Sequence, residues 1–242
     1  NVGLNLALFK SRLRLNVDYY YRRSTDLIGS RQLPLETGFS STTVNWASME
    51  NDGWEIALNT RNIDAKNFSW STSLNLGFNQ NKILNESVAE NSTYPSREGY
   101  SVGAIFAYKT AGLDEEGYPL FLAKDGTTQT AAEFFKLNRF GASTLSAEEQ
   151  RNQYSYMGTT DPKCSGGFIN TFEWGDWILN ANFIFNLGMK VRVQPSYSPT
   201  YFDRGLNTKH DILNRWTTTN TTTNMPALMV NTAARANEYT HY

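Results

Sequence analysis

The stretch Phe68–Asn79, FSWSTSLNLGFN, decides the fold of this chain. Every second residue from Phe68 to Phe78 is apolar except Thr72, and the residues between them are Ser, Asn or Gly. Because side chains alternate across a strand, this pattern predicts a strand with one apolar face and one polar, uncharged face. Its twelve residues, at ~3.3 Å each, extend over roughly 40 Å, enough to cross a membrane core of ~30 Å at a tilt of ~40°. Strands of soluble domains average only ~5–6 residues.

The same alternation marks five further segments, so that six strands are predicted in an all-β chain. The five are Val2–Leu8, Leu13–Arg22, Trp54–Arg61, Phe168–Trp174 and Trp177–Gly188. Six strands do not close a bacterial transmembrane barrel, which needs at least ~8. An open sheet edge in lipid would leave amides unpaired at a cost of several kcal/mol each. We therefore expect the sequence to be an internal piece of a larger antiparallel barrel.

Connections of very different length separate the predicted strands. Three polar stretches are predicted as long loops: Arg23–Asp52, Ile83–Gly167 and Val193–Tyr242. Gly175 and Asp176 form a two-residue turn signal. Short helices are predicted at Ser146–Tyr154, with Ser146 as the N-cap, and around Lys209–Trp216. In an outer-membrane barrel, short turns face the periplasm and long loops face the outside.

Composition agrees with a membrane barrel and excludes several other classes of protein. A formal net charge of -1 gives no indication of nucleic-acid binding. Aromatic residues make up 14% of the chain, which is expected where Trp and Tyr line membrane interfaces. Cys164 is the only cysteine, which excludes a disulfide-stapled scaffold. No apolar run approaches the ~18 residues that a transmembrane helix needs.

Five segments, in order along the chain, resemble the SusC/RagA family of TonB-dependent outer-membrane transporters. They are Arg12–Ile28, Leu33–Leu58, Phe68–Ile83, Glu98–Phe121 and Met157–Trp174. The second segment, LPLETGFSSTTVNWASMENDGWEIAL, carries Asn51, Gly53 and Glu55 at spacings characteristic of the family. Together the five segments cover most of the chain.

The resemblance implies a large transmembrane barrel of about twenty-two antiparallel strands, with long extracellular loops and an N-terminal plug. It implies import of glycans or peptides across the outer membrane, powered by the TonB complex, with a SusD-like surface lipoprotein capping the barrel. Residues 1–242 would then be a fragment of the barrel domain that lacks the plug, the TonB-contacting segment and the closing strands. Neither a cofactor nor enzymatic activity is expected.

Aromatic side chains in the predicted loops are the candidates for substrate contact, because their faces stack on sugars and pack on apolar peptide side chains. The candidates are Phe39, Trp46, Tyr94, Tyr100, Tyr118, Tyr154, Tyr156, Tyr197, Tyr201 and Trp216. For each one the alternative is packing between loops or contact with the capping partner. The strand tryptophans are instead predicted to form a girdle at the membrane interface. These are Trp54, Trp70, Trp174 and Trp177.

Charged residues on the polar strand faces have two interpretations. They line the path of the substrate, or they dock the plug through ion pairs, which is favoured in a plugged barrel. The residues are Arg14, Asp18, Arg22, Glu55 and Arg61.

Signals for metal binding and catalysis are weak. Asp114, Glu116 and Asp125 raise the possibility of calcium, but their spacing does not match an EF-hand loop, and solvated turns are favoured. His210 and His241 are the only histidines, and neither has a second His or Cys at ligand spacing. No nucleophile motif such as G-x-S-x-G is present.

Two other functions compete with glycan or peptide import. A siderophore or vitamin receptor would use the same kind of barrel. A soluble β-sandwich that binds carbohydrate or acts as an adhesin would cover the apolar faces with a second sheet and use strands of ~5–8 residues.

Overall fold

The computed structural model describes residues 1–33, 38, 39, 41–86, 88, 91–193, 207 and 209–228. The chain divides into two compact units, which are described separately. The sheet unit comprises Asn1–Ala89, Ser96–Ile105 and Met157–Val191. The loop unit comprises Glu90–Pro95, Phe106–Tyr156 and Arg192–Tyr242.

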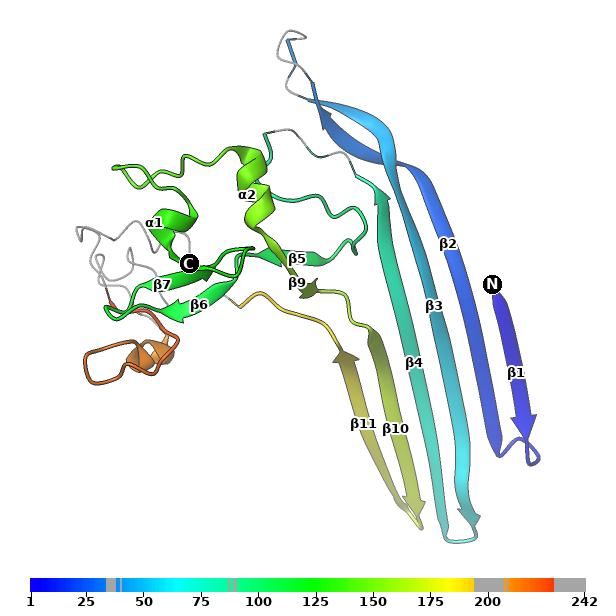
Figure 1. Ribbon diagram of the computed structural model, residues 1–242. Coiled ribbons are helices and arrows are strands. Elements are labelled where there is room, and N and C mark those ends of the chain that lie inside the picture. The colour runs from blue at the N-terminus through cyan, green and yellow to red at the C-terminus, as the bar shows by residue number, and fades with distance from the viewer. Residues whose placement is uncertain are drawn as a thin grey trace. The chain divides into compact units, whose positions relative to one another are not determined.

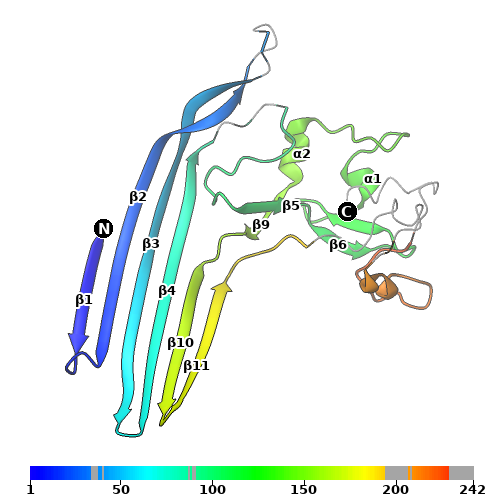
Figure 2. The ribbon, with the colours of Figure 1, turned by 180° about the vertical axis from the view of Figure 1, so that it is seen from behind.

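The sheet unit is built on one six-stranded sheet in which all neighbouring strands are antiparallel (Figures 1 and 2). Its strands, in spatial order, are β1 (Val2–Leu8), β2 (Leu13–Gln32), β3 (Ser41–Ala65), β4 (Phe68–Asn85), β10 (Cys164–Trp174) and β11 (Trp177–Leu187). The six predicted strands are thus confirmed, as is the two-residue turn at Gly175 and Asp176.

The register aligns apolar residues into rows that cross the whole sheet. One row consists of Leu6, Leu15, Leu58, Leu74, Phe168 and Phe183. The adjacent row on the opposite face consists of Asn5, Asn16, Ala57, Asn75, Gly167 and Ile184. A slip of one residue would move every apolar side chain to the polar face, so the pattern specifies the register strongly.

Gly53, in β3, leaves room for the side chain of Tyr20 to cross that strand. It pairs with Tyr20 on β2 and Asn79 on β4, and the Tyr20 hydroxyl donates to Asn79 Oδ1 at 2.8 Å. A Cβ on Gly53 would lie 2.5 Å from the Tyr20 hydroxyl and 2.3 Å from the backbone oxygen of Phe78. Glycine at this position therefore permits a hydrogen bond between side chains two strands apart.

The predicted loop Arg23–Asp52 is wrong. β2 and β3 remain paired as far as Gln32 and Ser41, and they continue past the end of β4 as a twisted two-stranded ribbon (Figure 1). Residues there do not alternate strictly between apolar and polar, so periodicity gives no strand signal. The register shifts between Ser24 and Leu27 and again between Leu27 and Ile28, and such bulges increase twist.

The loop unit contains short elements around its own apolar core, in a region predicted mainly as loop. Strands β6 (Thr110–Leu113), β7 (Pro119–Leu122) and β8 (Thr128–Thr130) form a small antiparallel sheet, which helix α1 (Ala131–Phe134) follows. Its buried core consists of Phe121, Ala131, Phe134, Phe135 and Leu145. Elements of four residues or fewer give no periodic signal long enough to recognise.

The remaining strands and the 3₁₀ helix have four or five residues each. Strands β5 (Ala104–Ala107) and β9 (Ser155–Thr159) pair in a two-stranded sheet. The predicted helix near Lys209 is a 3₁₀ helix, His210–Asn214. The segment after it contacts the turn before β7, because the Ala227 amide donates to the Gly117 oxygen at 3.0 Å.

Helix α2 (Ala147–Gln153) confirms the helix predicted in this region. The Ser146 hydroxyl accepts from the Glu149 amide, and the Glu149 carboxylate accepts from the Ser146 amide, which together form a capping box. The same carboxylate pairs with Lys136 Nζ at 2.8 Å. The bond from Lys136 and the bonds from Ser146 lower the pKa of Glu149 to about 2.

Replacing Glu149 with Gln should weaken the start of α2 in a pH-dependent way. The lowered pKa means that the ionised carboxylate stabilises the folded state above its ordinary pKa of 4.5, and that this contribution disappears as the pH falls toward about 2. Hydrogen–deuterium exchange of peptides covering 146–153 should be faster in Glu149→Gln than in the wild type at pH 6. The two rates should converge toward pH 2. A difference that is unchanged at low pH would contradict this role.

Gly53→Ala should destabilise the full-length protein by about 1–3 kcal/mol, because the new methyl group meets a backbone oxygen and the Tyr20 hydroxyl. Gly29→Ala is the matched control, since a Cβ there meets nothing within 4 Å. Denaturant unfolding of both variants measures the difference. Equal stability of the two variants would show that the close approach of Tyr20 is not required.

Candidate functional site

The apolar face of the six-stranded sheet is not covered by a second layer of described residues. Phe183 is 59% exposed, Leu179 64% and Trp177 81%. Neither Leu74 nor Leu76 is buried. A β-sandwich would bury these side chains against another sheet, and its strands would be shorter than the 25 residues of β3. The soluble β-sandwich predicted as an alternative is therefore wrong.

The height of the apolar face matches a membrane. Along β4 it runs from Phe68, opposite Trp174, to Phe78, opposite Trp54. These ten steps correspond to ~33 Å along the strand, and to ~25 Å along the membrane normal at a tilt of ~40°, the height of the apolar band on outer-membrane barrels. Beyond this stretch charged residues begin, with Asp52 opposite Gln80 and then Glu50 opposite Lys82.

The four predicted girdle tryptophans lie toward the two ends of this apolar face. Trp174 and Trp177 face each other beside the β10–β11 turn and are 72% and 81% exposed. Trp70 lies nearby and donates from its indole nitrogen to Asn170 Oδ1 at 3.0 Å. Trp54 lies at the other end, where its ring centroid is 4.9 Å from that of Tyr19. A role at the membrane interface stays a prediction for all four.

The polar face carries the charged residues that were predicted to face the barrel interior. Asp18 and Glu55 are opposite each other on β2 and β3. Together with Arg22, Asn51 and Asn79 they help to line a concavity of about 640 Å³. Two carboxylates at directly opposed positions repel each other, so a cation placed over them would be stabilised. Arg14 and Arg61 lie on the same face, and Arg61 pairs with Asp64 at 3.0 Å.

The predicted substrate-contact aromatics differ widely in how much surface they offer. Phe39 is 70% exposed, Trp46 55% and Tyr100 40%. Tyr118 is only 6% exposed, and Trp216 packs over Gly117. Tyr197 and Tyr201 lie outside the described residues.

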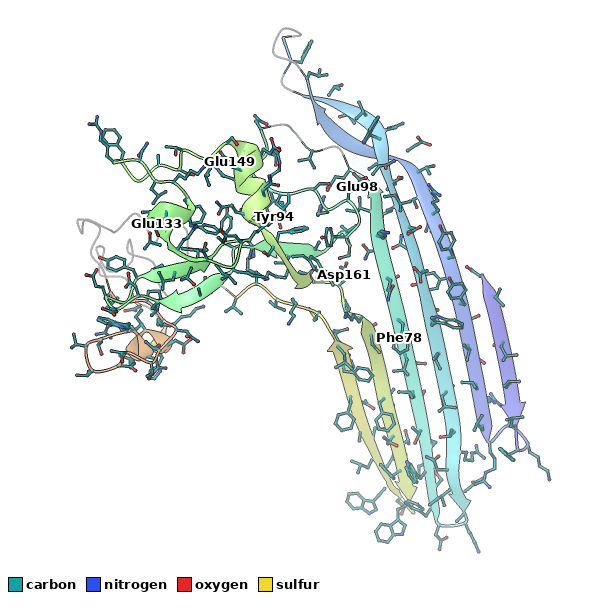
Figure 3. The ribbon with its side chains drawn as sticks, viewed as in Figure 1. Phe78, Tyr94, Glu98, Glu133, Glu149 and Asp161 are labelled. Atoms are coloured by element: carbon teal, nitrogen blue, oxygen red, sulfur yellow. The ribbon has the colours of Figure 1, made fainter. Side chains whose placement is uncertain are left out.

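Three other candidate aromatics, Tyr94, Tyr154 and Tyr156, pack against aromatic rings of the loop unit. Tyr94, which Figure 3 labels, has its ring centroid 5.4 Å from that of Tyr154 and 5.9 Å from that of Phe106. Tyr156, which lies in β9, also packs against Phe106, with ring centroids 5.8 Å apart, and is 44% exposed. Burial and a hydrogen bond with Tyr154 raise the pKa of the adjacent Tyr108. This packing is the alternative role that was considered for loop aromatics.

Tyr100 lies on a loop that polar contacts fix to the end of β4. The Glu86 carboxylate accepts from Arg97 Nε at 2.9 Å and from the Arg97 amide at 2.6 Å. Asn81 donates to Asp161 at 2.9 Å, and its own oxygen accepts from the Val102 amide at 2.8 Å (Figure 3). The loop therefore presents Tyr100 in a defined position.

Asp161, whose carboxylate accepts one of the hydrogen bonds that hold this loop, is ionised. Partial burial raises its pKa, but hydrogen bonds from Asn81 Nδ2, the Gly103 amide and neighbouring hydroxyls outweigh this and hold the pKa below its usual value. The ionised carboxylate is therefore the acceptor on which the loop contact depends.

Two of the carboxylates considered for calcium binding, those of Asp114 and Asp125, accept hydrogen bonds within their own turns. Asp114 Oδ1 accepts from the amides of Glu116 and Tyr118 at 2.9 and 2.8 Å. Asp125 Oδ1 accepts from the Thr127 hydroxyl and amide, which lowers the pKa of Asp125. Across the part of the chain that the structure describes, no three His, Cys, Asp or Glu residues gather to hold a metal ion.

Among the helices of the described residues, none combines the length and apolar character required to cross a membrane.

Comparison with known proteins identifies relatives among outer-membrane receptors. No family model matches the chain. TonB-dependent receptor P3 of Formosa agariphila is 29% identical over 93% of this chain, and TonB-dependent receptor P39 of the same species is 27% identical over 79%. TonB-dependent receptor SusC of Bacteroides thetaiotaomicron is 28% identical over 50% of the chain. The chain spans 23% of the length of P3 and 22% of P39.

Solved structures show the same fold. The RagAB peptide transporter superposes on 93% of this chain with a TM-score of 0.67 at 24% identity, and the chain covers 25% of that structure. The RagAB peptide importer in its open-open state gives a TM-score of 0.69 at 23% identity. The predicted resemblance to SusC/RagA TonB-dependent receptors is thus confirmed, and the six-stranded sheet corresponds to a sector of a transmembrane β-barrel that it does not close by itself.

An arginine on the apolar face should be far more costly than one on the polar face. Leu74→Arg places a charge in the middle of the apolar row and should destabilise the full-length receptor in bilayers by about 2–4 kcal/mol. Asn75→Arg, the adjacent residue on the opposite face, is the matched control and should cost much less. Urea unfolding in lipid vesicles measures both. Equal losses would show that lipid does not cover the Leu74 face.

Proposed function

We propose that this chain, as a relative of the SusC/RagA TonB-dependent receptors, forms part of the wall of an outer-membrane barrel that imports oligosaccharides or peptides. The observation that carries this proposal is the uncovered apolar face of membrane height, opposite a face of polar and charged residues. Such a sheet separates lipid from a polar interior. The likeness to RagAB supports the fold, and oligosaccharide and peptide both fit the aromatic and polar groups of the loops.

Several partners follow from this proposal. Outer-membrane lipid covers the apolar face, and a plug domain of the same receptor docks against the polar face, where Asp18 and Glu55 attract a basic side chain. A SusD-like surface lipoprotein closes the barrel from outside. The TonB complex supplies energy through another part of the receptor, and residues 1–242 belong entirely to the barrel domain. No nucleic acid takes part.

Ligand contact is assigned to the aromatics that remain accessible. Phe39, Trp46 and Tyr100 expose 70%, 55% and 40% of their surface, and Tyr100 is held by the loop anchored to β4. Trp46 occupies a bulge of β3, opposite the step between Leu27 and Ile28, and a bulge re-aims a side chain.

Energy-dependent uptake tests the proposal. Cells that carry the full-length receptor should accumulate a labelled oligosaccharide or oligopeptide, and cells without the receptor should not. A protonophore should abolish accumulation, because TonB-driven transport requires the energised inner membrane. Replacing Phe39, Trp46 and Tyr100 together by Ala should lower uptake at least about tenfold, since several stacking contacts are lost. Replacing the buried Tyr118 by Phe serves as the control.

Two results would contradict the proposal. Accumulation that persists in the presence of the protonophore would indicate passive diffusion. Receptor-dependent accumulation of ferric siderophore or vitamin B12, with none of oligosaccharide or peptide, would favour the other class of TonB-dependent receptor.

A further inference from the structure

A single carboxylate, that of Asp161, joins segments of the sheet unit that are far apart in sequence. Asp161 follows β9, and its Oδ2 accepts from Asn81 Nδ2 at 2.9 Å and from the Gly103 amide at 3.3 Å. Asn81 lies in β4, and Gly103 lies at the end of the loop that carries Tyr100. Sequence analysis did not select Asp161 as a site residue. One side chain therefore ties this loop to the strand.

The charge of Asp161 determines how the side chain of Asn81 is oriented. An ionised carboxylate only accepts hydrogen bonds, so Asn81 must turn its NH2 group toward Asp161. The Asn81 oxygen then faces the amide of Val102, which donates to it at 2.8 Å. With the Asn81 amide reversed, two donors would face each other at this position. Asp161 therefore acts on the loop both directly, at Gly103, and through Asn81.

The backbone at Tyr100 is itself paired with β4. The Ile83 amide donates to the Tyr100 oxygen, and the Gly99 amide donates to the Ile83 oxygen, each at 2.8 Å. Just beyond Tyr100, the hydroxyl oxygens of Ser101 and Thr159 lie 2.7 Å apart. The ring of Tyr100, which is 40% exposed, is thus presented by a backbone that moves only if these hydrogen bonds break.

Asp161 fits closely against the loop, and its loss would leave donors without an acceptor. Asp161 and Asn81 are both half-buried, and hydrogen bonds to an ionised acceptor are stronger than those between neutral groups. Removing the acceptor would leave the Gly103 amide and the Asn81 NH2 group unpaired, which is costly away from water. A Cβ on Gly103 would lie 2.7 Å from Asp161 Oδ1 and 2.4 Å from Thr160 Oγ1, so this contact leaves no room for a side chain.

We propose that Asp161 is a positioning residue for ligand capture: by holding the loop 97–103 on β4, it fixes Tyr100 before the ligand arrives. The proposal rests on the proposed function, in which Tyr100 contacts the imported oligosaccharide or oligopeptide. A preorganised loop lowers the entropy lost when the ligand binds. Asp161 acts on binding alone, so its loss weakens capture of the ligand and leaves the later, TonB-driven step unchanged.

Uptake kinetics in cells test this role. With Asp161→Ala, the full-length receptor should need about threefold more labelled oligosaccharide or oligopeptide for half-maximal uptake, at an unchanged maximal rate per receptor. Asp161→Asn keeps an oxygen acceptor and should restore most of the affinity. Asp176→Ala, in the β10–β11 turn, is the matched control and should behave like the wild type. A lower maximal rate with unchanged half-saturation would overturn the proposal.

A double-mutant cycle separates positioning from a general effect on stability. Tyr100→Ala should also raise the half-saturation concentration about threefold. If Asp161 acts through Tyr100, the variant with both substitutions should stay at about threefold, whereas independent effects would multiply to about ninefold. The multiplied effect would overturn the proposal.

A second variant displaces Asp161 without removing its charge. Gly103→Ala places a methyl group against Asp161 and should reproduce the effect of Asp161→Ala. Gly77→Ala is its control, because a Cβ there comes no closer than 3.5 Å to a neighbouring atom. In the purified receptor, hydrogen–deuterium exchange of peptides covering 97–103 should be faster in both loop variants and unchanged in the control. Unchanged exchange in the loop variants would show that Asp161 does not hold the loop and would overturn the proposal.

These results are distinguishable from a failure of the proposed function. Loss of protonophore-sensitive uptake in the wild type would contradict import itself. Normal energy-dependent uptake in the wild type, together with unchanged half-saturation in Asp161→Ala, would overturn only the positioning role.

Discussion

Backbone hydrogen bonding within lipid is the constraint on which the rest of the sheet depends. No water is available there to satisfy amides and carbonyls, so each strand must pair with its neighbours along its whole membrane-crossing length. The antiparallel ladder that results fixes the register, and the register in turn aligns Leu58, Leu74 and Phe168 on one face. The division into a lipid face and a polar face therefore follows from backbone pairing combined with a two-residue sequence period.

The strands governed by this hydrogen-bonding constraint are the part of the fold that the sequence predicts. Phe68–Asn79 could be recognised because lipid on one side and a polar interior on the other demand strict alternation. Beyond the end of β4 the described side chains of residues 23–29 are exposed or half-buried, so the demand disappears and residues 23–32 carry no periodic signal although they are paired. Helix α2 could be predicted because its capping box, Ser146 with Glu149, is a local signal.

The loop aromatics show why composition alone does not locate a functional site. Tyr94 and Tyr118 have the same chemistry as Tyr100, yet the first packs against other rings and the second is buried. Those differences arise from contacts between residues far apart in sequence, such as Tyr94 with Tyr154, which no local pattern encodes. Conversely, Asp161 has no distinguishing sequence context, and only its hydrogen bonds in the structure draw attention to it.

The need for backbone hydrogen-bond partners also applies to β1 and β11, the two outer strands of the described sheet. β1 pairs only with β2 and β11 only with β10, so each has one edge without a partner among the described residues. Soluble proteins protect such edges with charges, prolines or covering loops. The sequences of β1, VGLNLAL, and β11, WILNANFIFNL, contain no charged residue and no proline. Both edges are therefore suited to pair with further antiparallel strands, and in lipid that pairing is what would complete a closed wall around the polar face.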